Sequence, residues 1–98
     1  MRREEVIRRL KEHESEIRAF GVEHLHLYGS HARDEAGPNS DVDLFFDRDM
    51  SKKIGLFELI GLKFRLEALL GIDVDVGTRT SLHPVLKDEI ERSSLPVF

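Results

Sequence analysis

Apolar and polar residues follow one another along the chain with periods that predict helices and strands in turn. Apolar positions recur at helical spacing from about Arg2 to Phe20, and Gly21 follows where a helix C-cap is expected. Over Val22–Tyr28 the period shortens to two, which places Leu25 and Leu27 on one face of a strand and two histidines on the other. The start of the chain therefore predicts a helix followed by a strand with one covered face.

A turn-rich stretch separates this strand from a second one. A short helix is expected directly after Ser30, and the sequence GPNS is typical of a turn. The second strand spans Asp41–Phe46, with apolar residues at its even positions and two aspartates among its odd positions. One face of this strand is therefore expected to meet the core, while the other presents carboxylates.

The longest apolar segment predicts a helix from Ser51, a plausible N-cap, to Leu70, with Gly71 closing it. So much apolar surface calls for burial on more than one side of the helix. A helix deep in the domain is the interpretation we favour. The alternative is a helix packed between the sheet and another chain, as a homodimer or hetero-oligomer would allow. The main apolar stripe consists of Ile54, Phe57, Ile60 and Phe64, widened by leucines at 56, 59, 62, 66 and 69.

The rest of the chain predicts a third strand and a final helix. The strand is Ile72–Val76, and Thr80 or Ser81 is expected to cap a helix that contains Pro84. The closing residues LPVF predict a short strand or a tail. Helices and strands thus alternate, which is typical of a layered α/β domain.

The chain has 98 residues, which matches one domain over 1–98. A domain of this size has a thin core, so a substrate site is expected to be shallow or completed by a partner. With no cysteine there can be no disulfide, thiolate zinc site or cysteine nucleophile, which fits a reducing compartment.

Charge and hydropathy exclude two further classes of protein. The 15 basic against 19 acidic residues give a net charge of −4, the wrong sign for a protein that binds duplex nucleic acid through its phosphates. The first residues are charged where a signal peptide is apolar, and Glu58 and Lys63 interrupt the most hydrophobic segment. We therefore expect a cytoplasmic protein with no membrane segment.

The candidate chemistry begins with the acidic pair on the second predicted strand. Asp41 and Asp43 are two residues apart, so in an extended strand they point to the same side, roughly 6.6 Å from each other. Aspartate is disfavoured in strands, and packing does not explain two of them around an inward Val42. Hard divalent cations prefer carboxylate oxygens, and Mg²⁺ is commonly held by one or two carboxylates together with substrate phosphates. The pair therefore predicts a magnesium site.

Gly29 and Ser30 stand where the first strand gives way to a short helix. Glycine allows the backbone to turn toward a ligand, and helix amino ends attract phosphate. Taken alone, this dipeptide is usually an ordinary turn. Ten residues later comes the Asp-x-Asp pair, and together the two features predict the two halves of a metal–nucleotide site.

A third carboxylate is available on the predicted strand Ile72–Val76. Asp73 and Asp75 both point away from its apolar face. Asp75 is preferred as the partner of the acidic pair because Asp73 lies at the start of the strand, close to Gly71, where a solvated aspartate is ordinary. If this strand lies beside the second, Asp75 can help to orient an attacking hydroxyl and assist its deprotonation.

Three other patterns were weighed. An EF-hand over residues 41–49 is rejected because phenylalanines occupy positions that need an oxygen ligand and a glycine. His24 and His26 could bind zinc, but solvent-exposed strand histidines, which could line a nucleotide or partner surface, are the preferred interpretation. For Arg33, contact with a triphosphate and an ion pair with a neighbouring acid remain equally open.

The stretch LYGSHARDEAGPNSDVDLFF resembles the signature of the DNA polymerase beta-like nucleotidyltransferase superfamily, Gly-Ser followed after ten residues by Asp-x-Asp. It is most similar to the minimal nucleotidyltransferase (MNT) antitoxins that accompany HEPN-domain toxins. IDVDVGT resembles the strand that carries the third carboxylate, at Asp75. About 50 residues carry the motifs. The matching positions in the first motif are Gly29, Ser30, Ala32, Arg33, Ser40, Asp41, Asp43 and Leu44.

This resemblance implies a fold and an activity. The fold is a small mixed β-sheet flanked by α-helices. The activity is transfer of AMP from ATP, or a nucleotide from another NTP, to an acceptor hydroxyl, which in the antitoxin branch is a tyrosine of the HEPN toxin. Asp41, Asp43 and Asp75 would hold two Mg²⁺ ions, with Mn²⁺ as a substitute, and Gly29 and Ser30 would bind the β- and γ-phosphates.

One position departs from the family pattern. Asp34 follows the Ala-Arg pair where a glycine is common, which alters the turn but removes none of the chemistry. A catalytically inactive module that neutralises a toxin by binding alone is the competing hypothesis. Retention of all three carboxylates favours the enzyme.

Overall fold

A four-stranded mixed sheet organises the chain, and the computed structural model describes all residues 1–98. The strands are β1 (Val22–Tyr28), β2 (Val42–Arg48), β3 (Val74–Thr78) and β4 (Leu95–Pro96), in the order β3-β2-β1-β4. β1 pairs antiparallel with both β2 and β4, whereas β2 and β3 run parallel. The central strands are therefore the two that carry the Gly-Ser and Asp-x-Asp motifs at their ends.

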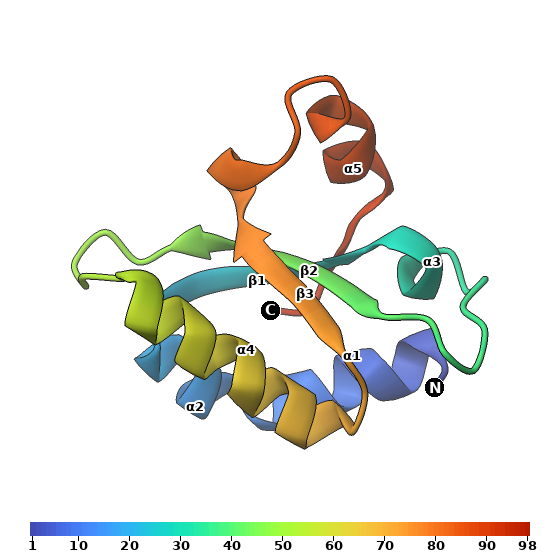
Figure 1. The fold of residues 1–98 in the computed structure, drawn as a ribbon, viewed down its shortest axis with the longest axis horizontal. Coiled ribbons are helices and arrows are strands. Elements are labelled where there is room, and N and C mark those ends of the chain that lie inside the picture. Colours follow the sequence, from blue (N-terminus) through green and yellow to red (C-terminus); the bar gives the residue numbers. More distant parts are fainter.

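Helices cover the two faces of this sheet unequally. Figure 1 shows α1, α2 and α4 beneath one face, with α5 and the turn before it on the opposite side. This arrangement confirms the predicted α/β architecture of a small mixed sheet flanked by helices, while the assignment of 1–98 as one domain stays a prediction. The helices are α1 (Arg3–Glu12), α2 (Glu14–Ala19), α3 (Gly29–Ala32), α4 (Leu56–Leu70), the 3₁₀ turn η1 (Arg79–Ser81) and α5 (Lys87–Ser93).

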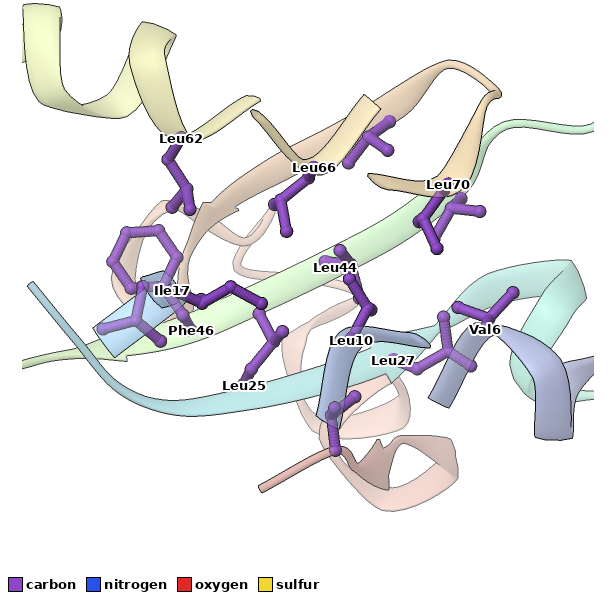
Figure 2. Close-up of a cluster of buried hydrophobic side chains, with 14 of the residues drawn as sticks. Val6, Leu10, Ile17, Leu25, Leu27, Leu44, Phe46, Leu62, Leu66 and Leu70 are labelled. Atoms are coloured by element: carbon purple, nitrogen blue, oxygen red, sulfur yellow. The ribbon is translucent and has the colours of Figure 1, made fainter. Parts of the chain in front are cut away.

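The core lies between the sheet and the α1, α2 and α4 layer (Figure 2). Its side chains come from alternate strand positions, as the period of two predicts, and from one face of each helix. β1, β2 and β3 each contribute buried residues to this cluster. Next to β4, the contribution comes from Val97, the residue that directly follows it. The fully buried members include Leu10, Ile17, Leu25, Leu27, Leu44, Phe46, Leu62, Leu66 and Leu70.

The first predicted helix is two helices. The chain leaves helical geometry at His13, which has φ −111° and ψ 24°. Its ring Nδ1 lies 2.8 Å from the carbonyl oxygen of Arg9, four residues earlier. A side chain bonded to the preceding turn competes with the helical backbone pattern, so α1 ends at Glu12 and α2 begins at Glu14.

The long helix begins at Leu56, five residues after the predicted Ser51 cap. The backbone N–H and the hydroxyl of Ser51 both donate to Oδ1 of Asp49, at 3.0 and 2.6 Å, which forms a turn instead of a helix start. The N-cap is Gly55, whose N–H donates to Oε2 of Glu58 at 2.9 Å. The predicted closure at Gly71 is confirmed by its left-handed φ of 73°.

The preferred interpretation of this helix as deeply buried is wrong. Leu62, Leu66 and Leu70 face the core, but Phe57 is 86% exposed and Phe64 is 63% exposed. The helix lies at the outside of its layer, so only one side can meet the sheet. Of the predicted stripe, Phe57, Ile60 and Phe64 are exposed on the outer face, whereas Ile54 precedes the helix and packs partly against the core. Leu62, Leu66 and Leu70 form the inner face, and Leu56 is exposed.

The C-terminal segment differs in detail from the prediction. β3 begins at Val74 and ends at Thr78, two residues later than expected at both ends. Thr80 and Ser81 lie in the η1 turn, and Pro84 precedes α5 because proline cannot donate a helical hydrogen bond. Of the two possibilities predicted for the closing residues, a short strand or a tail, the structure shows the strand, β4. None of the helices has the length and apolar character that crossing a membrane requires.

Candidate active site

The sheet face away from the core carries a row of three polar side chains, one from each of three neighbouring strands. Tyr28 of β1 pairs with Asp43 of β2, and Asp43 in turn pairs with Asp75 of β3. Residues directly opposite one another in neighbouring strands project to the same side. Because Val42 and Leu44 face the core, Asp43 and its two partners face outward. Thus β3 does lie beside β2, the condition on which the predicted role of Asp75 depends, and their parallel pairing brings Asp75 beside Asp43.

Asp41 lies just before β2, where a buried histidine holds the backbone. The side chain of His31 is 1% exposed, and its Nδ1–H donates to the carbonyl oxygen of Asp41 at 3.1 Å. Burial lowers the pKa of His31, which keeps the ring neutral, and the hydrogen bond opposes this only in part. No role was predicted for His31 from the sequence. Its place inside the motif, between the glycine-serine corner and the first aspartate, was the available signal.

Gly29 is in direct contact with the Asp43 carboxylate. Its φ is 76°, in the left-handed region that favours glycine. A Cβ added at this position would lie 3.1 Å from Cγ of Asp43 and 3.3 Å from its Cβ, and closer still to a carboxylate oxygen. Only glycine lets the corner between β1 and α3 approach the carboxylate so closely.

Burial raises the pKa of the Asp43 carboxyl above its ordinary value, and the charges of Asp75 and then Asp41 raise it further. The positive charge of Arg33 acts in the opposite direction. Tyr28 behaves in the same way: burial raises the pKa of its hydroxyl, followed by the charges of Asp43 and Asp75. These carboxylates are therefore near enough to repel one another, and the positive charge of Arg33 does not offset the rise in the pKa of Asp43.

The two candidates for the third carboxylate occupy different places. Asp75 is in register with Asp43. Asp73 precedes β3, and its carbonyl accepts a hydrogen bond from the N–H of Val42 at 3.0 Å. Together with Asp41 it lines a separate cavity of about 320 Å³. The geometry agrees with the preference for Asp75, whose catalytic role stays a prediction.

The remaining predicted nucleotide-binding residues lie at one edge of this site. Ser30 is partly buried at the start of α3. Arg33 is exposed and pairs with Glu35 at 3.2 Å, yet it is close enough to influence the pKa of Asp43. Both interpretations of Arg33, ion pair and ligand contact, therefore remain compatible with its position.

The donor chemistry of this site fits a hard cation. The available donors are carboxylate oxygens, which Mg²⁺ and Mn²⁺ prefer. Burial raises the pKa of Asp43 most, and the charges of Asp75 and Asp41 raise it further; a bound cation would relieve this repulsion. No group of three His, Cys, Asp or Glu side chains is arranged to hold a metal ion, so the three predicted ligands Asp41, Asp43 and Asp75 do not form such a group by themselves. This is the open kind of donor set that Mg²⁺ completes with water and substrate phosphate.

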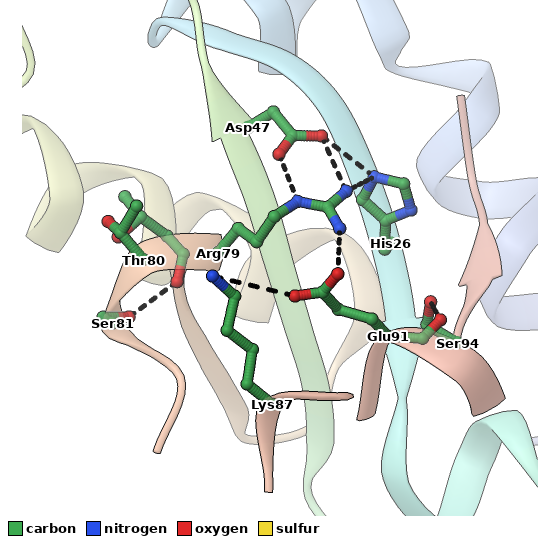
Figure 3. A network of polar contacts seen from close by, with 9 residues as sticks. His26, Asp47, Arg79, Thr80, Ser81, Lys87, Glu91 and Ser94 are labelled. Carbon is green, nitrogen blue, oxygen red and sulfur yellow. Dashed lines mark hydrogen bonds and ion pairs between the residues drawn. The ribbon is translucent and has the colours of Figure 1, made fainter. Parts of the chain in front are cut away.

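A second polar cluster lies further along the same sheet face (Figure 3). The guanidinium of Arg79 donates to both carboxylate oxygens of Asp47, at 2.6 and 3.0 Å, and pairs with Glu91 of α5 at 3.1 Å. His26 stacks on the ring of Phe45 with centroids 4.7 Å apart, and its Nε2 lies 3.2 Å from Asp47. The prediction that His26 is solvent-exposed is thus wrong, because this network covers its side chain.

Comparisons with known proteins place the chain in a family. The model of the nucleotidyltransferase domain matches residues 3–96. "Protein adenylyltransferase MntA" of Thermococcus cleftensis is 40% identical over 80 residues, which cover 81% of this chain and 79% of that protein. "Putative protein adenylyltransferase MJ0435" of Methanocaldococcus jannaschii is 40% identical over 78 residues, 80% of this chain and 82% of that protein.

Solved structures show the same fold. "Structure of putative minimal nucleotidyltransferase" superposes with a TM-score of 0.83 at 31% identity, covering 98% of this chain and 96% of that one. A toxin–antitoxin crystal structure with AMP-PNP gives a TM-score of 0.72 at 19% identity, covering 90% and 72%. An MNT antitoxin in complex with a tri-AMPylated HEPN toxin of Shewanella oneidensis gives 0.63 at 16%, covering 90% and 68%. The resemblance seen in the sequence is confirmed: this chain belongs to the nucleotidyltransferase domain family, in its minimal, MntA-like branch.

Proposed function

We propose that this chain is a protein adenylyltransferase that moves AMP from ATP to a hydroxyl of a partner protein, with a tyrosine of a HEPN-type toxin as the acceptor. The observation that carries the proposal is the outward row of Asp43 and Asp75 beside Gly29, with Asp41 at the head of the same strand. The names of the relatives, which are protein adenylyltransferases, support the same activity.

Mg²⁺, or Mn²⁺ in its place, would be held by Asp41, Asp43 and Asp75, and when bound it supplies charge stabilisation to the transferring phosphoryl group. The fit of these carboxylates to such a cation supports this assignment. In the proposed reaction the acceptor oxygen bonds to the α-phosphorus, the bond to the β-phosphate oxygen breaks, and pyrophosphate leaves.

The chain's own residues have three tasks in this reaction. Gly29 and Ser30 form the corner that receives the β- and γ-phosphates, and Arg33 lies near enough to add a positive charge. Asp75, on the outer strand of the row, orients the acceptor hydroxyl and receives its proton. The open sheet face leaves the acceptor side to be completed by the partner protein.

The first test is the intact mass of a HEPN-type partner after incubation with this protein, ATP and Mg²⁺. Mass gains in whole adenylate units are the expected result. The double variant Asp41→Asn/Asp43→Asn should leave the mass unchanged while keeping the parental circular dichroism spectrum, because both side chains lie outside the core. Transfer by the double variant at the parental rate would remove these residues from the metal site.

The second test is thermal unfolding with and without divalent cations. Mg²⁺ or Mn²⁺ should raise the melting temperature of the parental protein, since a ligand that binds only the folded state stabilises it. Buffer with EDTA and no added divalent cation gives the baseline. The melting temperature of Asp41→Asn/Asp43→Asn should not rise when Mg²⁺ or Mn²⁺ is added. A parental melting curve that ignores both cations contradicts an assembled cation site.

A module that neutralises a toxin by binding alone is the second candidate. The exposed Phe57 and Phe64 on α4 favour a protein contact at that face, which either function could use. A tight complex with a partner whose mass never changes would support this candidate over the enzyme.

A further inference from the structure

We infer that the cleft between α3 and α5 holds the nucleoside part of the nucleotide, with Leu86 and Ile90 against the base and Glu89 selecting for hydrogen-bond donors. This inference rests on the proposed function, because it adds a specificity site to the same reaction. The cleft measures about 230 Å³. Its lining residues are Tyr28, Gly29, Arg33, Leu86, Glu89, Ile90 and Ser93.

The cleft opens directly onto the catalytic row. Gly29 contributes to its wall and also touches the Asp43 carboxylate, while Tyr28 is the register partner of Asp43. A nucleotide whose phosphates lie at the Gly29 corner therefore has this cavity within reach. Whole small molecules occupy cavities of about 300 to 1,000 Å³, so this smaller one suits a fragment of the nucleotide.

The far wall is one face of α5. Ile90 N donates to the carbonyl of Leu86 at 2.9 Å, so these residues lie one turn apart on the helix. Leu86 is 49% exposed, and neither residue belongs to the core or packs against it. The apolar surface of this wall is thus available to a ligand, and the flat face of a nucleobase is a suitable apolar partner.

The same wall carries one carboxylate that the protein does not use. Glu89 forms no ion pair and no side-chain hydrogen bond, whereas Glu91, on another face of α5, pairs with Arg79 and Lys87. An ionised carboxylate only accepts hydrogen bonds and repels phosphate. Ribose hydroxyls and exocyclic amines are donors, so Glu89 suits the nucleoside and not the triphosphate.

The position of this wall is fixed from behind. Arg79 joins Asp47 of β2 to Glu91 of α5 (Figure 3). Its guanidinium also lies over the Phe45 ring, 4.9 Å from the ring centroid. The face of α5 with Glu91 is therefore anchored to the sheet. The helix can present Leu86, Glu89 and Ile90 to a ligand without first having to be ordered.

The test compares two ligands by calorimetry in Mg²⁺: α,β-methylene ATP, which cannot donate AMP, and inorganic tripolyphosphate, which lacks a nucleoside. Leu86→Ser and Ile90→Ala should each weaken binding of the ATP analogue at least about fivefold, the equivalent of about 1 kcal/mol, and leave tripolyphosphate binding within about twofold. Val85→Ser is the matched control, since Val85 is 81% exposed and lies outside the cleft lining. Glu89→Gln should weaken the analogue without strengthening tripolyphosphate.

Each other outcome overturns the inference in a recognisable way. Unchanged affinity of both cleft variants for the analogue, with parental AMP transfer intact, rejects the cleft and leaves the proposed function standing. If the cleft variants bind the analogue with unchanged affinity but have a raised KM for the acceptor protein, the cleft belongs to the acceptor. Stronger tripolyphosphate binding by Glu89→Gln places phosphates there. A parental protein that binds neither ligand and transfers nothing rejects both the cleft and the proposed function.

Discussion

The ionised carboxylate of Asp43 destabilises the folded protein. Burial and the neighbouring acids raise its pKa on folding, so the folded state holds this proton more tightly than the unfolded chain does. The protonated Asp43 carboxyl therefore contributes to folding stability in full below the unfolded pKa, and this contribution is lost as the pH rises through the raised, folded pKa. A residue of this kind is retained for chemistry, because stability alone would remove it.

We therefore expect Asp43→Asn to raise the melting temperature by a few degrees at pH 8 without divalent cations. The gain should shrink toward pH 4, where the parental carboxyl becomes protonated. Thermal unfolding across this pH range measures the effect. Asp73→Asn is the control, because it removes the same charge outside the row and should stabilise less. A loss of stability at pH 8 would contradict the repulsion inferred here.

The close approach of Gly29 to Asp43 gives a second prediction at this scale. Gly29→Ala should cost about 1 to 2 kcal/mol for its left-handed backbone and, in addition, displace the Asp43 carboxylate. Gly71→Ala is a matched control, since Gly71 has a similar φ of 73° but no atom within 4 Å of an added Cβ. Denaturant unfolding and AMP transfer are measured for both variants. Equal transfer rates would show that the contact is unimportant.

Single residues mark the limit of what the sequence could predict. The aspartates were found because two acids around an inward valine contradict strand propensity. The turn at Asp34 was noted only as a departure from the family pattern, and the structure explains the usual glycine: φ of Asp34 is 59°, a conformation that aspartate tolerates better than most residues. No role was predicted for His31 because a hydrogen bond to a backbone atom leaves no signal in the sequence beyond the place of the histidine inside the motif.

Among the elements, α5 and η1 are held to the sheet by ion pairs instead of core packing. The hydrogen bonds from Arg79 lower the pKa of Asp47, so this pair stabilises the fold above the unfolded pKa of Asp47 and loses that contribution as the pH falls through the lowered, folded value. The ion pairs of Arg79 with Asp47 and Glu91 thus hold η1 and α5 to the sheet, and both added salt and low pH should weaken them.

Arg79→Ala should destabilise the protein by about 1 to 3 kcal/mol, because it uncovers the buried Phe45 ring and leaves Asp47 and Glu91 with only His26 and Lys87 as partners. It should also increase proteolysis in residues 79–93. Arg65→Ala removes the exposed pair with Glu16 and should cost less than about 1 kcal/mol. Urea unfolding and limited proteolysis distinguish the two, and equal losses would argue against a special role for the Arg79 network.

The elements themselves were predicted better than their ends. Period and composition located every strand and the long helix, since a half-buried element repeats its apolar residues at its own period. The breaks at His13 and before Leu56 depend on side-chain hydrogen bonds of His13, Asp49 and Glu58 with the backbone. Side chains that bond to nearby backbone groups compete with the helical hydrogen bonds, and the spacing of apolar residues does not show where this happens.

Over the whole molecule, α4 divides the apolar residues into a buried and an exposed set. Phe57→Ser/Phe64→Ser should change the free energy of unfolding by less than about 0.5 kcal/mol per site while reducing the binding of hydrophobic dyes. Leu66→Ala, a fully buried control on the same helix, should cost about 2 to 5 kcal/mol. A large loss in the double variant would mean that the phenylalanines are part of the core.

The sequence could not tell the inner from the outer face of α4, because both faces are apolar. Phe57 and Phe64 match helical spacing as well as Leu62 and Leu66 do, so the period alone predicted burial for both sets. The site was more predictable than this surface, since carboxylates in register on neighbouring strands follow from topology. Sedimentation velocity of the purified protein distinguishes a second copy on the outer face, which gives a dimer, from a different partner protein, which leaves a monomer.

The sheet order has a consequence for synthesis on the ribosome. The outer edge of β1 is closed by β4, where Val97 N donates to the carbonyl of Leu25 at 2.8 Å. β4 is translated after every other element, and ribosomes add about 5 to 20 residues per second. For several seconds the nascent chain therefore displays an open strand edge, which favours chaperone capture or mispairing. A chain released before residue 95 would retain that edge permanently.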